Sequence, residues 1–146
     1  MPEPVRTLDE LDRMLFLRRV PLFQGLAPED LQRVAATAAE RFFAPDEPLV
    51  VEGDVGDELM VIVEGSVRIL RAENGTQRLV RRYGAGDHIG ELAALRDAPR
   101  AASVIADEPG VRGLVIGGQS LRAILRERPE AAMAMLATLA ERLSTA

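Results

Sequence analysis

Gly90, Glu91 and Arg100 are the residues whose types and spacing best suit the binding of a small anion. The pattern around Gly90 predicts a short helix, and the first turn of a helix presents free backbone N–H groups and a positive dipole end. Glycine has no Cβ, so a ligand can approach the backbone closely. The planar guanidinium of Arg100 matches two phosphate oxygens, and Glu91 can accept a hydrogen bond from a sugar hydroxyl. These groups indicate a site for a cyclic phosphodiester on a ribose, and they include no nucleophile.

Residues 88–104 resemble the phosphate-binding cassette of the cyclic nucleotide-binding domain family. That cassette reads Phe-Gly-Glu-Leu/Ile-Ala-Leu, a short spacer, and then Pro-Arg-Ala/Thr-Ala-Ser/Thr-Val. Ile89 stands in place of the phenylalanine, and the following residues match: Gly90, Glu91, Leu92, Ala93, Pro99, Arg100, Ala102, Ser103 and Val104. Residues 52–67 resemble the glycine-turned strand pair of the same family, and the resemblance extends from about residue 17 to the C-terminus.

The resemblance implies a sensor domain for a cyclic mononucleotide. The site that it implies consists of Gly90, Glu91, Leu92, Ala93, Arg100, Ala101 and Ala102. Family members that prefer cGMP tend to carry threonine where this chain has Ala101, so the resemblance implies cAMP as the ligand, with no other cofactor. Binding at Arg100 would draw the cassette inward and move the C-terminal helices. Ser103 is either a ligand contact or a hydroxyl bonded to backbone.

Two other interpretations remain open. A degenerate domain would keep the fold but serve as an interaction or homodimerisation module, which the absence of Trp and the apolar C-terminal helix favour. The complete set of Gly90, Glu91 and Arg100 argues against this reading. Alternatively, a cyclic dinucleotide or another organic phosphate uses the same cassette. A fused or separate effector, such as a DNA-binding domain in a longer protein, is compatible with each of these readings.

The base and its lid are less well defined by the sequence. We expect the base to stack inside the roll near Leu79, Val80 and Arg82. An apolar stripe on the last predicted helix either caps the base or packs on the roll or on a partner, and it consists of Met133, Leu136, Ala140 and Leu143.

Composition and isolated polar residues argue against other functions. The net charge of −5 argues against a nucleic-acid-binding surface, and there is no cysteine for a disulfide or thiolate site. No apolar run is long enough for a membrane span, so we expect a cytoplasmic, bacterial regulatory protein. His88, the one histidine, is expected to be a solvated strand-end residue without metal-ligand spacing to other residues. With no catalytic triad either, the sequence predicts a binding domain rather than an enzyme.

Short segments separated by Gly, Pro, Asn and Asp predict strands at residues 41–43, 49–51, 58–64, 66–71, 77–83, 88–89, 101–106 and 111–116. Asn74-Gly75 predicts a type I′ hairpin turn, and Gly53, Gly56 and Gly65 suit positive φ angles. Apolar spacing predicts helices at 8–20, capped by Thr7 with Glu10, and at 27–39, 91–95, 120–128 and 130–143.

This order of elements predicts a mainly β protein with flanking helices, in which a β-barrel or jelly roll carries the site. Residues 1–40 form an N-terminal helical segment, residues 41–117 the β-roll with the cassette at 89–104, and residues 118–146 the C-terminal helices. The whole chain is expected to form one domain.

Overall fold

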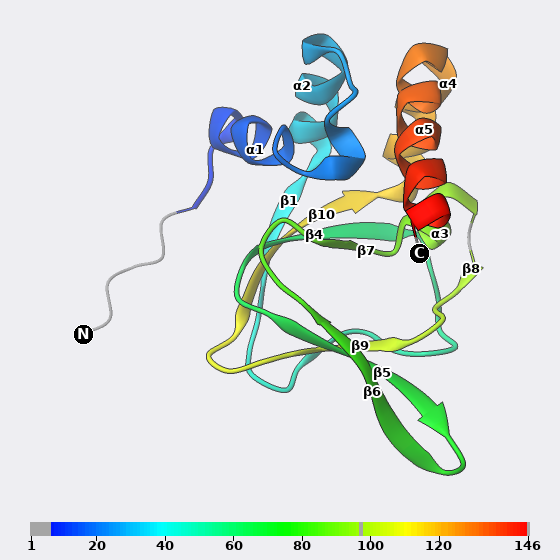
Figure 1. Ribbon diagram of the computed structural model, residues 1–146. Helices are drawn as coiled ribbons and strands as arrows, with labels where there is room; N and C mark the ends of the chain where they lie inside the picture. Colours follow the sequence, from blue (N-terminus) through cyan, green and yellow to red (C-terminus); the bar gives the residue numbers. More distant parts are fainter. Residues whose placement is uncertain (1–6, 97, 146) are drawn as a thin grey trace.

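The computed structural model describes residues 7–96 and 98–145, which fold into a two-layered antiparallel β-roll beneath a layer of helices (Figure 1). The upper sheet has the order β1 (Ala39–Phe43), β10 (Val111–Gly117), β4 (Glu58–Glu64) and β7 (His88–Ile89). The lower sheet has the order β2 (Pro48–Val50), β9 (Ser103–Ala106), β5 (Val67–Glu73) and β6 (Thr76–Tyr83). A separate short pair joins β3 (Val55–Gly56) to β8 (Ala98–Pro99). The predicted fold class is confirmed.

The helices lie at the two ends of the sequence, apart from one in the cassette (Figure 1). Before the roll come α1 (Glu10–Leu17), the 3-10 helix η1 (Pro21–Phe23) and α2 (Pro28–Thr37). The cassette helix is α3 (Glu91–Arg96), and α4 (Gly118–Glu127) and α5 (Pro129–Thr145) follow the roll.

Strand β4 of the upper sheet is apolar on both faces because helices cover one side of it and the lower sheet covers the other. Successive side chains of a strand point to opposite faces. In β4, Val61 therefore packs under the helices while Met60 and Ile62 fill the interior of the roll. Burial on both faces explains why β4 contains an unbroken apolar run. The cassette follows β7, the edge strand of this sheet.

The chain before the roll differs from its prediction at several boundaries. The side chain of Asp9, not Thr7, caps α1, because its Oδ1 accepts a hydrogen bond of 2.8 Å from the Asp12 N–H. Helix α1 ends at Leu17 rather than near residue 20, and α2 runs from Pro28 to Thr37 because the chain then becomes extended and enters β1.

The turn predictions for the roll are mostly confirmed. Asn74 and Gly75 both have positive φ, +51° and +79°, as a type I′ hairpin turn requires. Gly53 and Gly65 also have positive φ, but the prediction for Gly56 was wrong. Gly56 lies instead in β3, which the sequence did not reveal, since a strand of two residues leaves no periodic signal.

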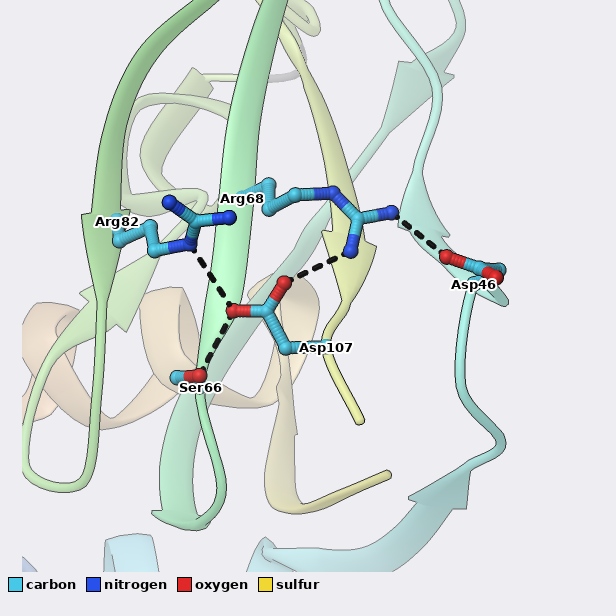
Figure 2. Close-up of polar contacts among 5 residues, drawn as sticks. All are labelled: Asp46, Ser66, Arg68, Arg82 and Asp107. Carbon is cyan, nitrogen blue, oxygen red and sulfur yellow. Dashed lines mark hydrogen bonds and ion pairs between the residues drawn. The ribbon is translucent and has the colours of Figure 1, made fainter. Parts of the chain in front are cut away.

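A group of charged and polar side chains joins the strands of the lower sheet (Figure 2). Arg68 on β5 binds Asp107 at 2.7 Å and Asp46 at 2.8 Å, and these hydrogen bonds raise the pKa of the guanidinium further. Burial raises the pKa of Asp107, but hydrogen bonds from Ser66 and Arg68 and the charge of Arg82 outweigh it, so this pKa lies below its ordinary value. The group fixes β5, β6 and the turn after β9 relative to one another.

Candidate functional site

Arg100 lies between β8 and β9 and is held first by its backbone. Its N–H donates to the Asp54 carbonyl at 2.9 Å, and its carbonyl accepts from the Gly53 N–H at 2.9 Å. These two bonds extend the β3–β8 pairing by one residue and fix where the arginine side chain begins. The side chain then reaches the start of β4, where Nη2 donates to the Glu58 carbonyl at 3.1 Å.

The guanidinium of Arg100 passes close to two glycines. A Cβ on Gly56 would lie 2.8 Å from Nη2, and a Cβ on Gly90 would collide with Nη1 and lie 2.5 Å from the Glu58 carbonyl oxygen. Gly90 also has a φ of +89°, which only glycine adopts without strain. Both positions therefore have to be glycine for the arginine to lie where it does. Gly56 was not among the predicted site residues, and its sequence signal was its place in the glycine-rich segment before β4.

The first turn of α3 follows Gly90 directly. Helix geometry leaves the N–H groups of Glu91, Leu92 and Ala93 without intrahelical acceptors. Ala93 is buried, whereas the Leu92 side chain is 64% exposed. The predicted helix of residues 91–95 is confirmed, one residue longer than expected. A cation and a set of unused backbone donors therefore lie on either side of Gly90, as an anion site requires.

Glu91 is in contact with His88. Its Oε2 lies 3.5 Å from Nε2 of His88, and the side chains are 31% and 1% exposed respectively. The prediction that His88 is solvated was wrong, because its imidazole is buried in the fold and lies against the Glu91 side chain. The Glu91 side chain therefore contacts protein through Oε2 and is also partly exposed to solvent.

The residues after Arg100 lead into β9. Ala101 is exposed, and Ala102 is half-buried and packs against the interior of the roll. The Ser103 hydroxyl accepts a hydrogen bond of 2.9 Å from the Glu52 N–H. Of the two roles open for Ser103, the structure supports the bond to backbone.

A hollow of about 200 Å³ lies beside Arg100, and Val51, Val55 and Gly56 are among the residues that line it. Ligand pockets usually measure about 300–1,000 Å³, so this hollow suits the sugar and phosphate of a nucleotide better than the whole molecule. A larger hollow of about 770 Å³, lined by Phe42, Glu64 and others, includes no cassette residue. The chemistry of the donors, not the volume, identifies the first hollow as the candidate site.

The residues expected to surround the base, Leu79, Val80 and Arg82, do not line the interior of the roll. Leu79 and Val80 on β6 are 45% and 36% exposed, and Arg82 forms an ion pair of 3.4 Å with Asp107. On α5, Met133 and Leu136 are 65% and 56% exposed. Ala140 is exposed as well, and the side chain of Leu143, the remaining member of the stripe, is outside the described residues.

The cassette helix is attached directly to α4. Nη1 of Arg122 donates to the Ala94 carbonyl at 2.7 Å, and a Cβ on Gly118 would lie 2.7 Å from the same oxygen. From α4 the contacts continue to α2 through the ion pairs Arg33–Glu127 (2.7 Å) and Arg128–Asp30 (3.1 Å). Helices α3 and α4 are therefore in direct contact through Arg122 and Gly118.

Two negative findings concern the described part of the chain. It contains no group of three or more His, Cys, Asp or Glu side chains that could hold a metal ion. None of its helices is both long and apolar enough to cross a membrane.

Comparison with known proteins agrees with this geometry. The family model described as "Cyclic nucleotide-binding domain" matches residues 40–128. A cAMP-dependent protein kinase regulatory subunit from Mucor circinelloides is 38% identical over 91 residues, which is 62% of this chain and 21% of that protein. The cyclic AMP receptor protein of Thermus thermophilus is 32% identical over 127 residues, 86% of this chain and 58% of that protein.

A solved structure is similar over a larger share of its own length. The N-terminal domain of a transcriptional regulator from Streptomyces coelicolor superposes with a TM-score of 0.77 at 36% identity, covering 89% of this chain and 91% of that one. Of the two curated relatives named above, by contrast, the chain spans only about a fifth and about six tenths of the full length. The family match covers the whole roll, from β1 through the cassette to α4, and on this basis the chain belongs to the cyclic nucleotide-binding domain family.

Proposed function

We propose that this domain is a cAMP sensor in which Arg100 binds the cyclic phosphate. The observation that carries the proposal is the position of the guanidinium between Gly56 and Gly90, next to the first turn of α3. Nη2 is the only nitrogen of this guanidinium that donates a hydrogen bond within residues 7–96 and 98–145. Nη1 and Nε could therefore donate hydrogen bonds to a phosphate. The other oxygens of that phosphate would accept from the backbone N–H groups of α3.

The remaining contacts follow from the same placement. Glu91 would accept a hydrogen bond from the ribose 2′-hydroxyl through its solvent-facing side. The N–H groups of Leu92 and Ala93 would bind the phosphate, while Ala101 and Ala102 would lie alongside it as small residues without a hydroxyl. Since threonine at position 101 could bond to the guanine amino group and alanine cannot, the preference is for cAMP over cGMP. The names of the two curated relatives, which refer to cAMP, support this choice.

The output of binding would be a movement of the helices. Phosphate bound at Arg100 draws α3 toward β3 and β8, and the contacts from Arg122 and Gly118 to Ala94 pass that movement to α4. Ligand binding and the position of the helices would then be coupled, because a ligand shifts a protein toward the conformation that it binds more tightly. The effector that reads this movement belongs to a longer protein or to a partner.

Titration calorimetry with cAMP and cGMP in parallel tests the proposal. Saturable one-to-one binding that favours cAMP supports it. Absence of binding heat and of thermal stabilisation with either nucleotide would contradict the proposal. Chromatography of the nucleotide after prolonged incubation should recover it unchanged, since Arg100, the side chain assigned to the phosphate, is neither a general base nor a nucleophile.

A second candidate function rests on α5. Met133 and Leu136 expose apolar surface three residues apart, the spacing of one helix face. If neither nucleotide binds, the domain would instead serve as an interaction or dimerisation module through this face. Light scattering of the wild-type chain and of the Met133→Glu variant distinguishes the two, because only an interface role makes the mass depend on that residue.

A further inference from the structure

His88 is a buried polar side chain on a strand that is otherwise apolar. It lies on β7 opposite Val61, and Ile89 beside it fills the interior of the roll. Burying an imidazole costs free energy unless its polar atoms are satisfied, whereas an apolar residue at this position would add to the core without that cost. The presence of a histidine here calls for an interaction that only a polar side chain makes.

We propose that His88 is a positioning residue that holds Glu91 ready for the ribose 2′-hydroxyl. This inference rests on the proposed function. Nε2 of His88 lies 3.5 Å from Oε2 of Glu91, and because a carboxylate only accepts hydrogen bonds, the proposed role requires the imidazole hydrogen to be on Nε2. The imidazole is 1% exposed and fixed by packing, whereas the Glu91 side chain is 31% exposed.

The advantage of this contact is preorganisation. A glutamate side chain at the start of a helix has several rotatable bonds, and ordering it on binding costs affinity. A carboxylate already fixed on one side by His88 keeps its solvent-facing oxygen available as an acceptor. His88 therefore acts on the ligand only through Glu91, and only on the part of the ligand that Glu91 contacts.

This mode of action makes a selective prediction. His88→Phe should weaken cAMP binding about five- to tenfold and change the binding of 2′-deoxy-cAMP less than about twofold. His88→Gln, which keeps an N–H donor, should stay within about threefold of wild type for both ligands. In the Glu91→Ala background, His88→Phe should have no further effect on cAMP affinity, because the group it acts through is gone.

Titration of wild type and of these four variants (His88→Phe, His88→Gln, Glu91→Ala and the double variant) with both nucleotides, alongside their thermal unfolding, tests the inference. Equal losses for cAMP and 2′-deoxy-cAMP in His88→Phe would mean that His88 only supports the fold. A gain in cAMP affinity would mean that His88 draws Glu91 away from the ligand. Each of these outcomes overturns the inference while leaving the cAMP site intact. If wild type binds neither nucleotide, the proposed function fails and this inference fails with it.

Discussion

Replacing Gly90 with alanine is the sharpest perturbation of the site, because the structure offers a matched control. Gly86 has a φ of +90° and open space where its Cβ would lie, and Gly90 has a φ of +89° with Arg100 and the Glu58 carbonyl oxygen in that place. An alanine at either position pays about 1–2 kcal/mol for its left-handed backbone. The difference between the two variants therefore isolates the collision.

The magnitude of the collision follows from the 2.5 Å approach to the Glu58 carbonyl oxygen, which is backbone and cannot rotate away. Forcing such a shift costs about 1–3 kcal/mol, so Gly90→Ala should lose about 2–5 kcal/mol of unfolding free energy and Gly86→Ala about 1–2. Since the new methyl group also displaces the guanidinium, cAMP affinity should fall at least about tenfold in Gly90→Ala and change less than about twofold in Gly86→Ala.

Urea denaturation of both variants gives the stability difference, and calorimetry at a temperature where both are folded gives the affinities. Equal stability losses in the two variants would show that Gly90 matters only for its backbone conformation. Wild-type cAMP affinity in folded Gly90→Ala would refute the placement of the phosphate beside Arg100.

Three further predictions concern other parts of the molecule. The pKa of Asp107 is lowered in the folded state, so the ionised carboxylate stabilises the fold above about pH 4, and this stabilisation is lost as the pH falls further. In Asp107→Asn, the free energy of unfolding measured with urea should therefore depend less on pH below about pH 5 than in wild type. Ala101→Thr should raise cGMP affinity relative to cAMP, and an unchanged ratio in parallel titrations would contradict the argument from that position. Arg128→Ala removes the cation that pairs with the carboxylate of Asp30, which is 2% exposed, and should lower the free energy of unfolding in urea by about 1–3 kcal/mol. Loss of the exposed Arg33–Glu127 ion pair should lower it by less than about 1 kcal/mol.

Long and strongly patterned elements of this fold could be predicted from the sequence. The bounds of β4 and the turn at Asn74 were correct, because an apolar run between glycines and an Asn-Gly pair have few alternative structures. The cassette helix was also placed correctly, since Gly90 marks its beginning.

Features that depend on tertiary packing could not be predicted. The strands β3 and β8 have two residues each and form only because the chain around Arg100 brings them together. Burial of His88 arises from tertiary packing, and a lone polar residue at a strand end gives no sign of this. Gly56 belongs to the site only because the Arg100 side chain passes beside it, which the local sequence does not indicate. Local sequence identifies the donors, but packing determines their surroundings.

The most direct test of the account is a calorimetric titration of the wild-type chain and of Arg100→Ala with cAMP, with thermal unfolding measured on both. Loss of a charge-assisted phosphate contact is worth about 2–5 kcal/mol, so the variant should unfold cooperatively like wild type but bind cAMP at least about 30-fold more weakly. A folded Arg100→Ala variant that binds cAMP as tightly as wild type would contradict the central claim.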